Sequence, residues 1–234
     1  MMDFVIKIGG SLGRGDKLKG LCCRLAELGR RHRMLIVPGG GAFADTVRHY
    51  DSRYRLGKSA SHWMAILAMD QFGYLLSELI PGSEPVRSLV VARKIAQAGK
   101  LPVLTPFDLL RRADPLPHSW SVTSDSIAAW VAELARAHML VLLKDVDGLY
   151  ADHPPEIGHV VLLEEILVEH LAICQGVDPC LASSLSTNAL DLWIINGEKP
   201  ERLAELLQKG CTKGTHLMRS LPSTAALSGD PPGR

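Results

Sequence analysis

Short apolar runs rich in β-branched residues alternate along the chain with longer segments in which apolar residues recur every three or four positions. The short runs have the character of buried strands, and the periodic segments that of helices packed on a sheet. The predicted strands cover residues 4–8, 34–37, 86–91, 101–104, 139–144 and 192–195. The predicted helices cover residues 16–33, 42–54, 58–79, 127–137, 163–173 and 200–208. The alternation predicts an α/β fold with adjacent parallel strands.

Two of the predicted strands end in glycine-rich turns. The first strand carries Lys7 and runs into Gly9, Gly10 and Ser11, and the second ends in Pro38 followed by three glycines, Gly39, Gly40 and Gly41. Parallel neighbours bring such turns to one edge of a sheet, where open α/β proteins bind ligands. Glycine lets backbone amides approach a phosphate closely, and a lysine adds a full positive charge. The pair of turns therefore favours a phosphate site over two ordinary strand–helix turns, although the lysine precedes the glycines and no Walker A loop is present.

Three further stretches hold polar residues with open alternatives. The segment 58–79 is rich in Met and aromatic residues and is more typical of core or a subunit interface than of a ligand pocket, with His62 and Gln71 as its notable polar members. Ser124 or Asp125 can simply cap the helix that follows. The Asp147–Gly148 pair after the strand 139–144 can be an ordinary turn.

Composition narrows the class of protein. Of the 234 residues, 47% are hydrophobic and 22% charged, and the formal net charge of +1 argues against a general nucleic-acid or membrane-surface binder. The five cysteines are odd in number and show no CxxC spacing, so we expect reduced thiols and no metal site.

No apolar run suits a signal or a membrane span, and a cytoplasmic protein is expected. The Ser-, Pro- and Gly-rich residues 219–234 are expected to form a loose tail.

Six motifs together resemble the amino acid kinase family over residues 3–218. In chain order they are VIKIGGS, VPGGGAFAD, VTSDSIAAWVA, LLKDVDGLY, IINGEKPERL and KGTHL. The resemblance implies a three-layer αβα sandwich around a mainly parallel sheet, formed by a single domain of residues 1–218. It also implies that an N-terminal half, about residues 1–120, binds the phosphoryl acceptor and that a C-terminal half, about 121–218, binds ATP.

The resemblance also implies roles for particular residues. Lys7 would contact the transferring phosphoryl group, Asp125 would orient the catalytic lysines, and Lys144 would supply a second positive charge. The remaining roles concern binding. Gly9, Gly10 and Ser11 would contact the ATP phosphates through backbone amides, Asp145, Asp147, Gly148 and Tyr150 would form the nucleotide side, and Gly39, Gly40, Gly41, His62 and Ser124 would bind the acceptor. Mg²⁺ would be held mostly by ATP and water, with no protein metal site.

The chain departs from the family pattern in one place. Many members have a Gly-Met-x-x-Lys segment before the last strands, whereas residues 177–185 here contain no lysine. Either Lys144 takes over that charge or the protein binds nucleotide more weakly, and a non-catalytic nucleotide- or oxyanion-binding relative is the alternative.

The segments 61–71 and 177–202 resemble the branch that includes the kinase of aminomethylfuran-methyl phosphate in methanofuran assembly. This branch implies an ATP-dependent small-molecule kinase that acts on a small phosphomonoester in the biosynthesis of a C1-carrier cofactor, and the alternative is a carboxylate kinase that makes an acyl phosphate. A homo-oligomer, a dimer or larger, is expected.

Overall fold

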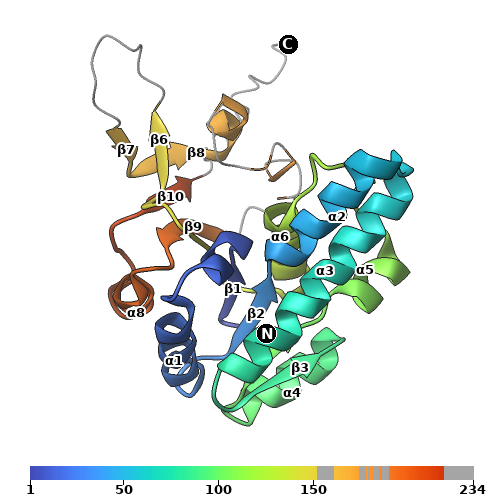
Figure 1. The fold of residues 1–234 in the computed structure, drawn as a ribbon. Coiled ribbons are helices and arrows are strands. Elements are labelled where there is room, and N and C mark those ends of the chain that lie inside the picture. Colours follow the sequence, from blue (N-terminus) through green and yellow to red (C-terminus); the bar gives the residue numbers. More distant parts are fainter. Residues whose placement is uncertain (152–160, 174–177, 179, 182–184, 186–189, 219–234) are drawn as a thin grey trace, which may run out of the picture.

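The computed structural model describes residues 1–151, 161–173, 178, 180–181, 185 and 190–218. Within this part of the chain, eight strands form one sheet in the order β3-β4-β2-β1-β5-β9-β10-β8, and β6 (Leu149–Ala151) pairs with β7 (Val161–Leu163) outside it (Figure 1). The strands of the large sheet are β1 (Phe4–Ile8), β2 (Met34–Pro38), β3 (Ser83–Val86), β4 (Leu101–Leu104), β5 (Met139–Lys144), β8 (Glu165–Leu167), β9 (Asp191–Asn196) and β10 (Thr215–Met218). The predicted tail, 219–234, lies outside the described residues.

Six neighbouring strands of this sheet, from β3 to β9, are parallel, whereas β10 runs antiparallel to β9 and parallel to β8. Strand β1 lies at the centre, with Ile6 level with Ile36 on β2 and with Val141 on β5. The carboxyl ends of β1, β2, β5 and β9 therefore meet at one edge. In this order β1 to β4 form one half of the sheet and the later strands form the other.

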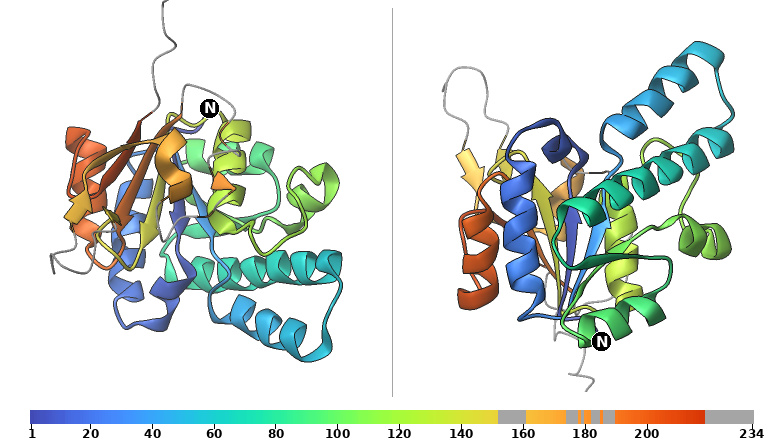
Figure 2. Two further views of the ribbon diagram at one scale, coloured as in Figure 1. Left: turned by 90° about the horizontal axis from the view of Figure 1, so that it is seen from above. Right: turned by 60° about the horizontal axis from the view of Figure 1, so that its bottom comes forward.

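Helices cover both faces of the sheet, so the predicted three-layer αβα sandwich is confirmed (Figure 2). One face packs on α1 and α8 and on the C-terminal half of α3, and the other packs on α4 and α6. Helices α2 and α3 lie side by side and extend beyond the sheet. The helical segments are η1 (Gly10–Arg14), α1 (Leu18–Gly29), α2 (Gly41–Tyr54), α3 (Lys58–Leu79), α4 (Leu89–Gln97), α5 (Phe107–Ala113), α6 (Ser124–Ala135), η2 (Val168–Ile173) and α8 (Pro200–Lys209).

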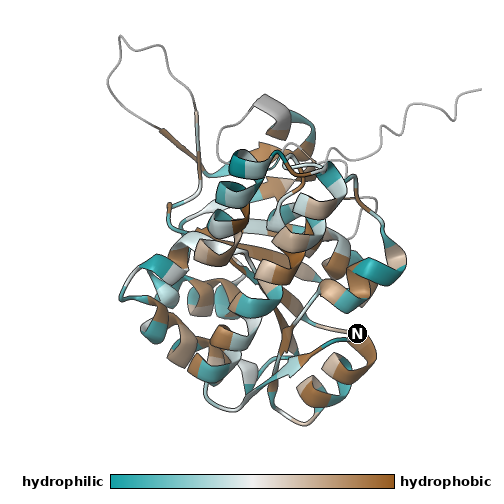
Figure 3. Ribbon diagram, turned by 45° about the vertical axis from the view of Figure 1, so that its right-hand side comes forward, coloured by the Kyte–Doolittle hydropathy of each residue, from teal (hydrophilic) through white to brown (hydrophobic). Residues whose placement is uncertain are grey.

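Side chains along β1 alternate between the two faces of the sheet, and this alternation determines where its one charged side chain lies. Ile6 and Ile8 belong to the core beneath α1, and Val5 belongs to the core beneath α6. Because side chains alternate across a strand, Lys7 lies on the same face as Val5 and is directed toward α6. The hydrophobic strands run through the centre of the molecule, and the polar positions lie on the outer helical surfaces (Figure 3). Among the described residues, no helix combines the length and the apolar character that crossing a membrane requires.

Two predicted elements are wrong. The strand expected at 86–91 ends at Val86, and helix α4 begins at Leu89, where the Ser88 hydroxyl accepts a hydrogen bond from the amide of Val91. The apolar residues of that segment thus belong to two elements. The helix expected at 163–173 is instead strand β8 followed by η2, since the hydrogen bonds of β8 are made to β10, about fifty residues later in the chain.

The Met-rich pattern of α3 is mostly core. Met69 is buried against the sheet, and Met64 packs in a small cluster with α2. The exposed apolar side chains of this helix are instead Leu67, Tyr74 and Leu75. The predicted oligomer stays a prediction.

Candidate active site

A buried carboxylate joins two lysines at the edge where the central strands end. Lys7 Nζ lies 2.7 Å from Oδ1 of Asp125, and Lys144 Nζ lies 2.7 Å from Oδ2 of the same residue. Lys7 comes from β1, Lys144 from the end of the adjacent strand β5, and Asp125 from the first turn of α6. The three residues predicted to be catalytic are thus brought together.

The electrostatics of this triad follow from its burial. Burial alone would raise the pKa of Asp125, but the charges of Lys7 and Lys144 and their hydrogen bonds outweigh it and hold that pKa below its ordinary value. Burial lowers the pKa of Lys7, and the attraction of Asp125 opposes this. Two lysine side chains thus share one carboxylate, an arrangement that suits an anionic ligand.

The start of α6 is fixed by residues other than those predicted. Thr123 is the N-cap, and its hydroxyl accepts a hydrogen bond of 3.2 Å from the amide of Asp125. The buried carboxylate of Asp178 accepts hydrogen bonds from the amide of Thr123 at 2.6 Å and from the hydroxyl of Ser126 at 2.6 Å. A carboxylate at a helix N-terminus is favourable because it faces free amides and the positive end of the helix dipole. The alternative that Ser124 or Asp125 simply caps this helix is therefore wrong. The side chain of Asp125 can instead face the lysines.

The two glycine turns touch each other. A Cβ on Gly10 would lie 2.2 Å from the backbone nitrogen of Gly41, and a Cβ on Gly40 would lie 2.4 Å from the Cβ of Ala44. Gly41 also has a φ of +55°, a conformation that other residues rarely adopt. Only glycine permits this approach, which places the start of α2 beside the turn that follows β1.

Two glycines do not offer the amides that the sequence analysis expected. The amide of Gly9 donates a hydrogen bond of 2.8 Å to the carbonyl of Leu143, and the amide of Gly39 donates one of 2.8 Å to the carbonyl of Ile8. The expected contact of the Gly9 amide with a phosphate is therefore wrong. Both residues instead allow close backbone packing between neighbouring strand ends, and Gly10 and Ser11 remain in position to face a ligand.

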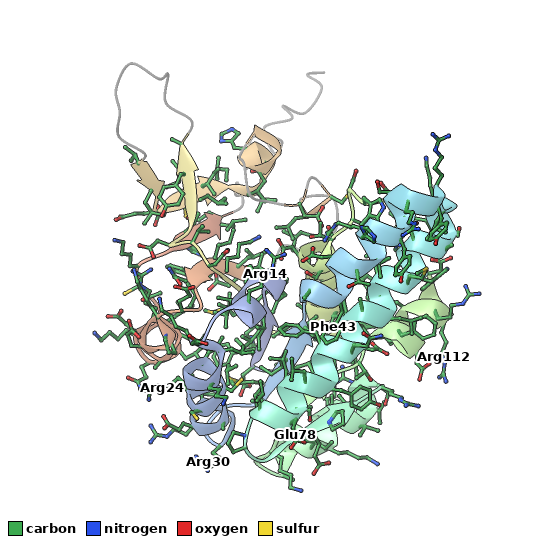
Figure 4. All side chains as sticks on the ribbon, viewed as in Figure 1. Arg14, Arg24, Arg30, Phe43, Glu78 and Arg112 are labelled. Carbon is green, nitrogen blue, oxygen red and sulfur yellow. The ribbon has the colours of Figure 1, made fainter. Side chains whose placement is uncertain are left out.

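A pocket of about 390 Å³ adjoins the turns and runs between α2 and α3 toward the loop before α6. Its volume lies in the range of small-molecule sites. Predicted site residues on its wall are Gly10, Ser11, Gly40, Gly41, His62 and Ser124. Arg14, at the end of η1, pairs with Asp45, and both residues line the pocket; Figure 4 shows Arg14 close to the N-terminal end of α2. Four of the five predicted acceptor residues, all except Gly39, therefore line one cavity.

His62 is held in an aromatic cluster at the pocket wall. Its ring stacks on that of His118 with centroids 4.3 Å apart and meets Trp63 edge-on. Burial, and then the neighbouring His118, lower its pKa, which favours a neutral imidazole. His62 can therefore contribute hydrogen bonds to a ligand more readily than positive charge.

The residues predicted for the nucleotide side form a second cluster. Asp147 accepts hydrogen bonds from Arg202 at 2.8 Å and from Asn196 at 2.8 Å, and it also pairs with Lys199 and Lys213. These hydrogen bonds, above all that of Arg202, hold its pKa below the ordinary value. Asp147 thus joins the ends of β9 and β10 and gathers three cations.

The other predicted nucleotide-side residues divide between packing and surface. A Cβ on Gly148 would lie 2.5 Å from Oγ1 of Thr215, so glycine is needed there for packing. Tyr150 is half-buried on β6, and Asp145 is exposed next to Lys144.

The family model for the amino acid kinase family matches residues 2–188, which is most of the chain. The chain belongs to the amino acid kinase family. The membership that six short motifs predicted is therefore confirmed.

Similar proteins within this amino acid kinase family are also kinases. The [5-(aminomethyl)furan-3-yl]methyl phosphate kinase of Methanocaldococcus jannaschii is 31% identical over 206 residues, covering 87% of this chain and 92% of its own. The uridylate kinase of Pyrococcus abyssi is 25% identical and covers 92% of this chain and 98% of its own. These relatives place the chain among phosphotransferases.

Solved structures support the same fold. The uridylate kinase of Archaeoglobus fulgidus has a TM-score of 0.72 at 18% identity and covers 92% of this chain and 100% of its own. The isopentenyl phosphate kinase of T. acidophilum has a TM-score of 0.61 at 20% identity and covers 93% of this chain and 100% of its own. At these identities the likeness concerns the amino acid kinase fold.

The segment in which many amino acid kinases carry an additional lysine is described only in part. Of residues 177–185, the structure describes Asp178, Cys180, Leu181 and Leu185. Asp178 has the clear role there, because its carboxylate fixes the turn that presents Asp125. Sequence analysis missed this role, since a contact between residues more than fifty positions apart leaves no local pattern.

Proposed function

We propose that this amino acid kinase transfers the γ-phosphoryl group of ATP to the phosphate of a small phosphomonoester and forms a diphosphate. The observation that carries the proposal is the Lys7–Asp125–Lys144 triad, which lies where two glycine turns meet beside a pocket. Phosphoryl transfer needs in-line placement and positive charge at the equatorial oxygens more than covalent help from the protein. The described residues around the triad offer both.

Each part of the site has a role in this proposal. Lys7 and Lys144 stabilise the negative charge that spreads over the transferring group, and Asp125 holds both ammonium groups in position. The turn at Gly10 and Ser11 faces the donor phosphates, and the turn at Gly40 and Gly41 faces the acceptor. The lysines and glycine turns suit a triphosphate, and Mg²⁺ carried by its phosphates and water would neutralise part of their charge.

The acceptor is proposed from the most similar of the named relatives together with the pocket. We infer an acceptor like [5-(aminomethyl)furan-3-yl]methyl phosphate, the compound in the name of the Methanocaldococcus relative. A pocket of about 390 Å³ accommodates a phosphate with one ring.

The test is ADP release from Mg-ATP by the purified protein, with separate additions of this phosphomonoester, isopentenyl phosphate, UMP and amino-acid carboxylates. We expect release with the furan phosphate and little with the others. Stimulation by a carboxylate alone would replace the proposal with an acyl-phosphate kinase. Binding of ATP without release in any mixture would support a non-catalytic relative, for which the segment without the additional lysine is the specific reason.

A further inference from the structure

Asp51 is a carboxylate in the pocket wall that is held by neutral donors. It lies in the last turn of α2, where Oδ1 accepts a hydrogen bond of 2.8 Å from the hydroxyl of Ser61 and Oδ2 accepts one of 2.6 Å from Nε1 of Trp120. All three residues line the pocket. The hydrogen bonds from Trp120 and then Ser61 lower the pKa of Asp51, so it is ionised near neutral pH.

The charge of Asp51 has no cationic partner among the described residues. Asp45, the other carboxylate of the pocket, differs in this respect because Arg14 and Arg48 both pair with it. Lys58 also lines the pocket, but it forms no ion pair with a described residue. Asp51 lies near the C-terminus of α2, where the helix dipole adds a partial negative charge. This end of the pocket therefore presents a carboxylate that forms no ion pair with a described residue.

The other end of the pocket lies at the glycine turns. Gly41 begins α2 beside the turn that follows β1, and Asp51 comes ten residues later. At a rise of 1.5 Å per residue this separation is about 15 Å along the helix axis. Apolar side chains of Ile66, Met69 and Ile127 line the cavity as well. The pocket thus has the glycine turns at one end and Asp51 at the other, with an apolar wall suited to a compact ring.

We propose that Asp51 is an ammonium-binding residue of the acceptor site, so that the acceptor carries a primary amine at the end remote from its phosphate. The inference rests on the proposed function for the position of the phosphate. Ser61 and Trp120 position the carboxylate, and both of its oxygens keep lone pairs for an incoming N–H donor. A neutral ring such as uracil leaves this charge unpaired, so the residue selects against uridylate-type acceptors.

The test compares two acceptors that differ in one group: the aminomethyl-bearing phosphomonoester named above, and its hydroxymethyl counterpart. Calorimetry without ATP gives their dissociation constants, and ADP release gives kcat/KM. A charge-assisted hydrogen bond predicts that the wild-type protein prefers the amine by about 10- to 100-fold. In Asp51→Asn the ratio should fall to within about threefold of unity. The variant is close to isosteric, because Asn can accept from Trp120 and donate to Ser61.

Asp45→Asn is the matched control, since it removes a pocket carboxylate that two arginines already compensate. It should keep the preference for the amine. Equal binding of the two compounds by the wild-type protein, or an equal loss of preference in both variants, would overturn the role of Asp51 even if both compounds are phosphorylated. An amine preference that depends on Asp51, in a protein that phosphorylates neither compound, would keep the ammonium site and overturn the proposed function. Binding of neither compound would overturn both.

Discussion

The Nζ atom of Lys7 lies 2.7 Å from Oδ1 of Asp125, and both side chains are almost completely buried. A buried cationic group beside the reacting atoms acts most strongly on charge that develops during the reaction. In Lys7→Met, Asp125 keeps Lys144 as a partner, so the fold should persist. We expect kcat to fall by about 10²- to 10³-fold, with a smaller change in the KM for ATP. Steady-state kinetics with circular dichroism would check both expectations.

Lys17→Met is a suitable control for that variant, because Lys17 is exposed and pairs with Glu198 on the surface. Its kcat should stay close to that of the wild-type protein. A Lys7→Met enzyme with comparable activity would remove Lys7 from the mechanism.

Asp178 should affect both stability and catalysis through the start of α6. Asp178→Ala leaves the amide of Thr123 and the hydroxyl of Ser126 without their acceptor, and we expect the free energy of unfolding to fall by about 2–3 kcal/mol. Because this turn presents Asp125, kcat should fall while the KM for ATP changes little, at a temperature where the variant is fully folded. Urea unfolding and kinetics would measure the two effects.

Two graded variants separate positioning from general instability. Asp178→Asn keeps one acceptor oxygen and should recover part of kcat, and Ser126→Ala removes only the hydroxyl bond, at a cost of about 1 kcal/mol. A wild-type kcat in folded Asp178→Ala would show that Asp178 has a structural role alone.

The contact between the glycine turns predicts that Gly10→Ala is poorly tolerated. The added methyl would lie 2.2 Å from the nitrogen of Gly41, so one turn must move away from the other. We expect at least a tenfold loss of kcat/KM, because small displacements of reacting groups reduce rates strongly. Gly15→Ala adds the same methyl nearby with nothing within 4 Å, and it should retain activity. Equal kinetics of the two variants would contradict the role given to the turns.

Asp70 should make stability depend on pH. Burial raises its pKa from the ordinary value of 3.8 to about 6, although its carboxylate accepts a hydrogen bond from the amide of Phe107. The folded state thus binds a proton that the unfolded state releases between these values, and this residue's contribution to stability falls as the pH rises from about 4 to 6. Asp70→Asn should raise the free energy of unfolding by about 1 kcal/mol at pH 7.5, after allowance for its partial exposure, and by much less at pH 4. Urea unfolding at the two pH values would show this difference, and an equal effect at both would contradict it.

Much of the fold could be predicted because its signals are local. The apolar runs at β1, β2 and β5 are bounded by glycine or charge, and α2 and α3 were predicted almost to the residue. Strand β8 could not be found in this way, since its pairing partner β10 follows about fifty residues later. The boundary at Leu89 depended on the hydroxyl of Ser88, which competes with a run of valines that favours a strand.

The candidate site was predictable where a motif carries its chemistry, as for Lys7, Asp125 and Lys144. The residues that position these groups were not, because Asp178 acts through hydrogen bonds to a distant turn. Asp51 was missed for a similar reason. A single aspartate at the end of a helix has no distinguishing pattern until Ser61 and Trp120 are seen to hold it at the pocket wall.

The position of β10 between β9 and β8 has a consequence for the order in which the protein folds. Among the described strands, β8 pairs with β10 alone, so it has no place in the sheet until residues 215–218 are available. On the ribosome, the four strands from β1 to β4 can assemble early, whereas β8 must wait for the last described strand. Pairings over such separations are slow to form and expose strand edges in the meantime. Loss of the residues from Thr215 onward would remove β10 and leave both β9 and β8 with unpaired edges. We expect aggregation to be the first observable result of such a truncation.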